Sequence, residues 1–390
     1  MDVVIVGAAR TAIGGYGGTL RDVPLPQIVI PVMDYVVKQA GIEKNDIEDI
    51  IFGNTFGLEY GNVARTCGIF GGYPVEVPGM TINRVCNSSM EAINVGAMKI
   101  KTGVADIIMA GGVESMSSSP YIMTQLRWGT RLRSSKAIDI LWDGMQEPIF
   151  GLGMGLTAEK LAEIHNISRE EQDKVALRSH QNAAKAVKDG KFKDEVVPLT
   201  IPTKKGEIIF DKHEHVREDT SLEALAKLKP AFKKDGTVTP GNACGMNDAG
   251  AMLILMSEKK AKERGVKPLA RIVSYGLAGV DPDIMGWGPV PATQKALKMA
   301  GMEMKDIELI ELNEAFAAQY IACEKGLGFD RDIANVNGGG ISLGHPIGAT
   351  ATRLVVTLIF EMKRRKNRYG LATLCGGGGI GTSLIIENLD

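Results

Sequence analysis

The sequence predicts an α/β protein made of two similar halves, with a charged insertion between about residues 119 and 247. Short β-rich runs alternate with helix-like segments, which is typical of α/β folds. One order of elements occurs twice: a strand, a loop with a reactive side chain, a helix, a second strand and then glycines. The repetition is one of pattern, without evident residue identity, and it indicates a duplication.

In the first half, strands are expected at residues 3–6, 49–52, 79–82 and 105–110, the last running into Gly111-Gly112. A helix is expected at 28–40, and another follows Cys86 and ends at Gly103, because apolar residues recur at helical spacing in both. The second half repeats this with strands at 307–312, 333–336, 371–374 and 383–387 and a helix from about residue 347.

The insertion is charged and contains a helix-like run at 169–189. The alternation of strand-like and helix-like segments resumes near residue 248, with an apolar run at 249–256 and a polar helix near 258–264. We therefore expect an N-terminal half at 1–118 together with 248–268, a loop domain at 119–247 and a C-terminal half at 269–390.

Composition excludes several classes of protein. The 390 residues are 44% hydrophobic and 23% charged, so the chain is not mostly disordered. The net charge of −1 gives no basic field, so no nucleic-acid partner is expected. The apolar runs are too short for a membrane span, and the N-terminus lacks the pattern of a signal peptide. Five cysteines without a Cys-x-x-Cys fit a reducing cytoplasm, which we expect as the location.

Two cysteines are candidates for chemistry. Cys86 lies between a strand and a helix, where the helix N-terminus is expected to lower a thiol pKa and its N–H groups to bind an oxyanion. Cys375 precedes four glycines that let the backbone approach a ligand closely. For both, simple core packing stays open as the alternative, and for Cys67 and Cys323 packing is the better interpretation.

His345 follows a glycine-rich loop and starts a helix, which favours neutral imidazole, the base form. Asn313-Glu314 follows a strand and precedes a helix, a pattern that an ordinary helix cap also explains.

Three other motifs fail on their context. Gly376-x-Gly378-x-x-Gly381 is followed by a strand rather than by the helix of a dinucleotide site. Gly340-x-Ser342-x-Gly344 lacks a histidine in hydrolase order. His213-x-His215 has no further metal ligand nearby, so we expect a solvated loop and no metal site.

Four separated motifs together resemble the thiolase family over essentially the whole chain. They are Asn83-Arg84-Val85-Cys86, Asn313-Glu314-Ala315-Phe316, Gly344-His345-Pro346 and Cys375-Gly376-Gly377-Gly378, and the segments at 111–117 and 288–292 add to the match. The resemblance implies the thiolase fold, two α/β halves in an αβαβα stack with an inserted loop domain for coenzyme A binding and oligomerisation.

The resemblance also implies an acyltransferase that reversibly condenses two acetyl-CoA to acetoacetyl-CoA and CoA through a Cys86 acyl-enzyme, in ping-pong order. His345 would take the Cys86 proton, and Cys375 would exchange the α-proton of the second substrate. His345 and a water held by Asn313 would stabilise the enolate, and the N–H groups of Cys86 and Gly377 the tetrahedral intermediate. No cofactor is implied beyond the CoA thioester substrates.

The same resemblance places the coenzyme A contacts. Arg217 would lie at the adenine end, and the acyl-pantetheine channel would be lined by Phe232, Cys244, Met154, Ala315 and Phe316. Ser89, Cys244 and Gly153 depart from the usual Gly, Ser and His of such positions, which leaves acyl chain length open. The stretch 123–145 resembles a loop that joins dimers, so a homotetramer is expected.

Two alternatives remain at this stage. One is a 3-ketoacyl-CoA thiolase that acts on longer chains in fatty acid metabolism. The other is a non-catalytic thiolase-like scaffold that binds acyl-CoA, against which the presence of all four reacting residues argues.

Overall fold

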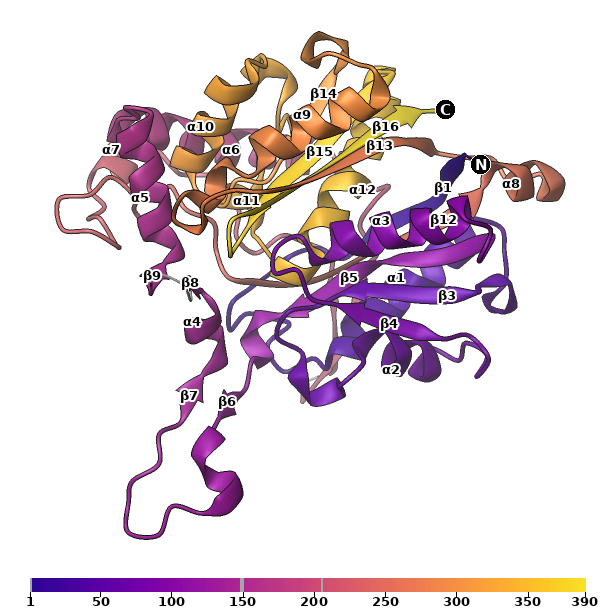
Figure 1. The fold of residues 1–390 in the computed structure, drawn as a ribbon, viewed down its shortest axis with the longest axis horizontal. Coiled ribbons are helices and arrows are strands. Elements are labelled where there is room, and N and C mark those ends of the chain that lie inside the picture. Colours follow the sequence, from indigo (N-terminus) through magenta and orange to yellow (C-terminus); the bar gives the residue numbers. More distant parts are fainter. Residues whose placement is uncertain (1, 148–150, 205) are drawn as a thin grey trace.

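The computed structural model describes residues 2–147, 151–204 and 206–390, and a ten-stranded mixed sheet runs through it (Figure 1). The strand order is β14–β15–β16–β13–β1–β12–β5–β3–β4, and β2 pairs with β12. The bounds are β1 Val3–Arg10, β2 Gly14–Gly15, β3 Asp49–Gly53, β4 Gly79–Ile82, β5 Ile107–Ser115, β12 Asn247–Ser257, β13 Ala270–Gly279, β14 Leu309–Leu312, β15 Tyr369–Gly376 and β16 Ile380–Asn388.

The sheet consists of two halves with the same topology, as the sequence predicts. In the first half β1, β12, β5 and β3 pair antiparallel, antiparallel and then parallel. In the second half β13, β16, β15 and β14 repeat this order of pairings. The two halves meet where β1 and β13 pair antiparallel, with Val4 opposite Arg271.

Helices form three layers around the two half-sheets (Figure 1). Helices α1 and α2 pack on the outer face of the first half, and α9 and α10 on the outer face of the second. Helices α3 and α12 lie between the halves, where their apolar residues share one core with strands of both. Their bounds are α1 Leu25–Gln39, α2 Val63–Phe70, α3 Ser88–Lys101, α9 Pro289–Ala300, α10 Ala317–Leu327 and α12 Ile347–Arg365. The layers give the predicted αβαβα stack, and both α3 and α12 begin at the junction of the halves.

The duplication also extends to residues, so the expectation of a pattern without identity is wrong. Ala40-Gly41 after α1 corresponds to Ala300-Gly301 after α9. Each pair is followed by a one-turn 3₁₀ helix whose Glu-x-x-Asp capping box is the same in both halves, Glu43 with Asp46 and Glu303 with Asp306. These two short matching segments lie outside the motifs that contain the candidate catalytic residues.

Two local predictions are corrected. The expected strand at 333–336 is reduced to a single parallel β-bridge, between Ala334 and Ile310. The pairing stops there because the side chain of Asn335 occupies the backbone groups of Leu312: it accepts from the Leu312 N–H at 2.9 Å and donates to its carbonyl at 2.7 Å. Gly111 and Gly112 lie within β5 rather than after it. A β-carbon on Gly112 would lie 2.1 Å from the Gly348 carbonyl oxygen, so glycine permits the close approach of α12.

Between β5 and β12 the chain leaves the central sheet, and residues 121–144 form an arm that projects from the body (Figure 1). This stretch contains β6 Tyr121–Ile122, β7 Ile138–Asp139, α4 Ile140–Gly144, β8 Gln146–Glu147, β9 Leu152–Gly153, α5 Met154–Ile164, α6 Arg169–Lys188, β10 Leu199–Thr203, β11 Gly206–Phe210 and α7 Leu222–Ala226. The residue boundaries of the three predicted domains stay a prediction.

The remaining short α-helices are α8 Glu258–Arg264 and α11 Gly340–Leu343. None of the helices in the described part of the chain has the length and apolarity needed to cross a membrane.

Candidate active site

Cys86 sits in a tight turn between β4 and α3 that two polar side chains hold in place. Val85 has φ of 50°, a rare conformation for a β-branched residue. Ser88 Oγ accepts from the Arg84 N–H at 2.8 Å and donates to the Val85 carbonyl at 2.6 Å, while Asn83 Oδ1 accepts from the Val85 N–H at 3.0 Å. The turn therefore fixes where the Cys86 sulfur points.

The sulfur lies in an apolar pocket and next to two backbone N–H groups. It packs against the cluster formed by Phe56, Met116, Leu141 and Ile347. Burial raises the pKa of the Cys86 thiol to about 11, although hydrogen bonds from the N–H groups of Gly377 and Cys86 itself lower it in part. The predicted lowering of this pKa is wrong in direction, because loss of hydration outweighs the hydrogen bonds from these two N–H groups.

His345 precedes α12 and presents one ring nitrogen that has no partner. Its backbone N–H donates to Asn247 Oδ1 at 2.8 Å, and its Nδ1 lies 2.7 Å from Thr350 Oγ1. The Nε2 atom is buried and has no hydrogen-bond partner among the described residues. Burial, and secondly the charge of Arg353, lower the pKa of His345 to about 3, which agrees with the predicted neutral imidazole.

Asn313 lies beside His345 and is not a helix cap. Its Nδ2 is 3.5 Å from His345 Nδ1, and its buried Oδ1 has no partner in the part of the chain that the structure describes. Helix α10 starts only at Ala317. Glu314 instead accepts from Ser179 Oγ at 2.6 Å and Asn335 Nδ2 at 2.8 Å, which fastens the Asn313 segment to its surroundings.

Cys375 lies at the end of β15, directly before a hairpin of glycines. Gly378 and Gly379 have φ of 80° and 76°, which glycine alone adopts freely. The Cys375 side chain is buried, and burial raises the pKa of its thiol well above the ordinary value. Cys86 is the second cause of this increase, so the two sulfurs lie close enough for their charges to interact. Both cysteines are therefore protonated at rest.

The residues predicted to contact an acyl-CoA flank the same region. The Phe232 ring packs flat against Gly155 and meets the Phe316 ring edge-on, with centroids 6.1 Å apart. Met154 Sδ lies 3.6 Å from where a β-carbon of Gly377 would be. The Cys244 N–H donates to the Ala315 carbonyl at 2.9 Å, and Cys86 contributes to raising the pKa of the Cys244 thiol to about 12, after burial.

Arg217 lies apart from this group. Its backbone N–H donates to Nδ1 of the buried His180 at 3.2 Å, and its own side chain is exposed. The predicted solvated loop at His213 is wrong. His213 Nδ1 accepts from the Ile13 N–H at 3.2 Å, and its Nε2 lies 3.3 Å from the Arg10 guanidinium. Among the described residues, no three His, Cys, Asp or Glu side chains gather as a metal site.

Sequence reasoning missed the buried side chains whose hydrogen bonds fix the segments next to the reactive groups. Glu114 is fully buried and accepts from the N–H groups of Thr55, Phe56 and Gly348. Asn87 Oδ1 accepts from Thr382 Oγ1 at 2.7 Å, which joins the Cys86 turn to β16. No periodicity or composition marks such residues, because their partners come from distant segments. The segment 111–117, which contains Glu114, added to the family resemblance but gave Glu114 no role.

Comparison with known proteins agrees with this arrangement. The family profiles described as "Thiolase, N-terminal domain" and "Thiolase, C-terminal domain" match residues 3–259 and 266–388. An acetyl-CoA acetyltransferase of Syntrophomonas wolfei is 51% identical over 100% of this chain and 99% of its own. The crystal structure of the Bacillus anthracis acetyl-CoA acetyltransferase superimposes with a TM-score of 0.98 at 51% identity, covering 100% of this chain and 99% of that one. Human mitochondrial 3-ketoacyl-CoA thiolase in complex with CoA superimposes with a TM-score of 0.95 at 41% identity, covering 100% and 98%.

Proposed function

This chain belongs to the thiolase family, and on that premise we propose that it is an acetyl-CoA acetyltransferase that reversibly condenses two acetyl-CoA to acetoacetyl-CoA and CoA. The observation that carries this proposal is the placement of the candidate groups: the charges of Cys86 and Cys375 interact, and Ile347, close after His345, packs in the cluster that contacts Cys86. Among the described residues, His345 Nε2 and Asn313 Oδ1 have no hydrogen-bond partner. Coenzyme A thioesters are the substrates, and the reaction needs no further cofactor.

The first half-reaction acylates Cys86. His345 Nε2 takes the Cys86 proton as the sulfur attacks the thioester carbonyl, so imidazolium forms only when the substrate is present. The tetrahedral oxyanion is held by the N–H groups of Cys86 and Gly377, which already point at this sulfur. The carbon–sulfur bond to CoA then breaks, and Cys375 gives its proton to the departing CoA thiolate. Acetyl-Cys86, free CoA, imidazolium and the Cys375 thiolate result.

The second half-reaction forms the carbon–carbon bond. The Cys375 thiolate removes an α-proton from a second acetyl-CoA, and the enolate oxygen accepts from His345 Nε2–H and from a water held by Asn313 Oδ1. The enolate carbon attacks the acetyl group on Cys86, the Cys86 thiolate leaves, and it recovers its proton from His345. Every group returns to its resting protonation state, so the cycle closes and runs in either direction.

Coenzyme A would lie along the inserted stretch, with its pantetheine passing Phe232, Met154, Cys244, Ala315 and Phe316. The edge-on contact of the two phenylalanine rings and the flat packing of Phe232 on Gly155 support a preformed apolar channel there. Arg217 would meet the adenine end, since its exposed guanidinium makes no hydrogen bond or ion pair among the described residues.

A comparison of substrates tests the function. We expect thiolysis of acetoacetyl-CoA to exceed that of 3-ketooctanoyl-CoA at equal CoA concentration. A preference for the longer substrate would move the protein to the long-chain thiolases. No turnover of either, together with no selective alkylation of Cys86 by iodoacetamide and no protection by acetyl-CoA, would make it a binding scaffold.

The projecting arm supports a homotetramer made of two dimers. Several large apolar side chains of the arm face solvent: Tyr121 is 66% exposed, Trp128 91%, Leu132 103% and Trp142 62%. A second copy of the same arm would cover them. We also propose a cytoplasmic location, which the five unpaired cysteines support. Light scattering of the full chain, and of a variant with the four residues changed to Ser, tests the assembly.

A further inference from the structure

One hydroxyl group contacts the proposed base from the side opposite to the reacting atoms. Thr350 Oγ1 lies 2.7 Å from His345 Nδ1 and is fully buried in the first turn of α12. The contact leaves the other ring nitrogen, Nε2, without a partner among the described residues. Asn313 Nδ2, the other polar neighbour of Nδ1, is 3.5 Å away, too far to compete with the hydroxyl.

The direction of this hydrogen bond follows from the second contact of the hydroxyl. Thr350 Oγ1 also lies 2.8 Å from the Pro346 carbonyl oxygen, which can only accept. A threonine hydroxyl has a single proton, and in a helix it commonly donates that proton to the carbonyl four residues earlier. Once the proton is directed at Pro346, the oxygen can only accept from the ring. His345 Nδ1 therefore carries the ring proton, and Nε2 carries the lone pair.

We propose that Thr350 is a positioning residue that fixes the His345 tautomer needed to accept the Cys86 proton; this inference rests on the proposed function. In the step that it supports, the S–H bond of Cys86 breaks and an N–H bond forms at Nε2. Nδ1–H keeps donating to Thr350 Oγ1 before and after that transfer, so the hydroxyl stabilises the imidazolium without moving. The ring then presents Nε2–H to the enolate in the second half-reaction.

Substitutions that separate the hydroxyl from the methyl group test this role. Thr350→Val keeps the shape and removes the hydroxyl, whereas Thr350→Ser keeps the hydroxyl. We expect Thr350→Val to lower kcat for thiolysis of acetoacetyl-CoA by about 10- to 100-fold with KM changed by less than about threefold. Thr350→Ser should stay within about threefold of the wild type. Thr357→Val is the matched control, because Thr357 is a buried threonine of the same helix whose hydroxyl contacts Glu195 instead, at 3.2 Å.

Alkylation of Cys86 by iodoacetamide gives a readout that a purely structural defect would not produce. Without the acceptor for Nδ1–H, the imidazolium is disfavoured, so alkylation of Thr350→Val should be about tenfold slower than the wild type at neutral pH. The difference in alkylation rate between Thr350→Val and the wild type should become smaller toward pH 10, where the Cys86 thiol increasingly loses its proton to water without help from His345. A general disturbance of the fold in Thr350→Val would slow alkylation by the same factor at every pH.

Three results would overturn the inference: wild-type kcat in Thr350→Val, a loss in Thr350→Ser as large as in Thr350→Val, or an alkylation gap that does not change with pH. If Thr350→Val does not fold, Thr350→Ala replaces it, since Ala and Ser leave the same missing methyl group and differ only in the hydroxyl. Alkylation needs no acyl substrate. An inactive wild type with a Thr350-dependent alkylation gap would therefore refute the proposed function and leave the tautomer assignment standing.

Discussion

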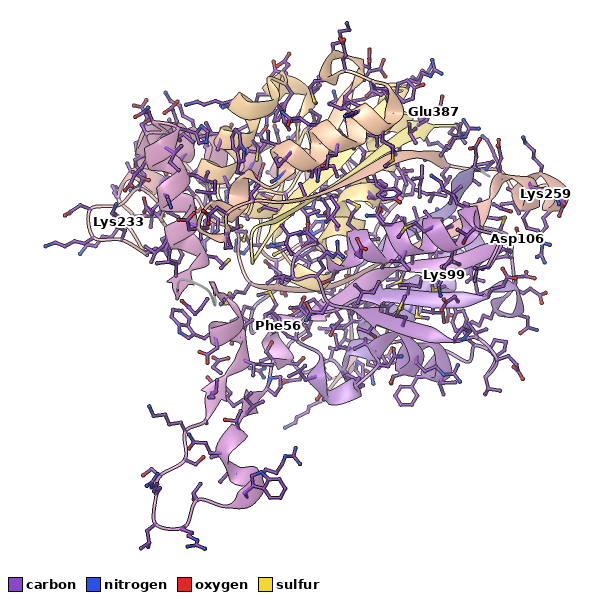
Figure 2. All side chains as sticks on the ribbon, viewed as in Figure 1. Phe56, Lys99, Asp106, Lys233, Lys259 and Glu387 are labelled. Carbon is purple, nitrogen blue, oxygen red and sulfur yellow. The ribbon has the colours of Figure 1, made fainter. Side chains whose placement is uncertain are left out.

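Glu114 Oε2 accepts a hydrogen bond from the backbone N–H of Gly348 at 2.8 Å, which joins the first half of the protein to the start of the helix that follows His345. The same carboxylate accepts from Asn54 Nδ2 and from the N–H groups of Thr55 and Phe56. Phe56 in turn lines the Cys86 pocket where the arm meets the body (Figure 2). One buried side chain thus joins the segment that lines the Cys86 pocket to the first turn of α12, close after His345.

Replacing Glu114 should change how stability depends on pH. Burial raises the pKa of Glu114 from the usual 4.5 to about 7. The native state therefore prefers the protonated carboxyl, and the stability that this group contributes is complete below about pH 4.5 and is lost as the pH rises through about 7. Glu114→Gln cannot ionise, so the free energy of unfolding of the wild type minus that of the variant should fall by about 3 kcal/mol between pH 4.5 and 8.

Urea unfolding at both pH values measures this difference. Glu59→Gln is the control for the Glu-to-Gln change itself, because Glu59 is exposed. If the free energy of unfolding of the wild type minus that of Glu114→Gln were the same at both pH values, the Glu114 carboxyl would titrate in the folded protein as it does in the unfolded chain.

Gly112 should tolerate no side chain. A β-carbon there would lie 2.1 Å from the Gly348 carbonyl oxygen and 2.8 Å from that of Gly53, so α12 would have to move. We expect Gly112→Ala to lower the free energy of unfolding by about 1–3 kcal/mol and to reduce kcat by displacing His345. Gly15→Ala, whose β-carbon would have 3.7 Å of space, is the matched control. Thermal unfolding and kcat near wild-type values for both variants would show that α12 is not held by this contact.

Leu141 should limit the length of the acyl chain. It belongs to the arm, is buried, and packs in the cluster that surrounds Cys86. Leu141→Ala should raise kcat/KM for 3-ketooctanoyl-CoA relative to acetoacetyl-CoA by about tenfold or more, because space opens beside the acyl group. Asp143→Ala changes an exposed residue close by and should leave this ratio unaltered. An equal fall for both substrates in Leu141→Ala would assign Leu141 to packing alone.

The elements of the fold followed from local sequence signals more completely than the chemistry of the site. Periodicity and glycines located the strand and the helix on either side of Cys86, and the helix and the strand that follow His345, because those signals lie within a few residues of each other. The pKa of Cys86 was predicted in the wrong direction, since the side chains that bury it come from Phe56, Met116 and Leu141. The false strand at 333–336 has the same origin, because one side chain, Asn335, takes the place of a backbone partner.

Trapping the acyl-enzyme tests the role of Cys86 as the nucleophile most directly. Cys375→Ala, incubated with radiolabelled acetyl-CoA and digested, should retain label on the peptide that contains Cys86 while forming no acetoacetyl-CoA. Cys86→Ala should retain none. Label on Cys86→Ala, or on Cys375 in the wild type, would contradict the assignment of Cys86 as the nucleophile.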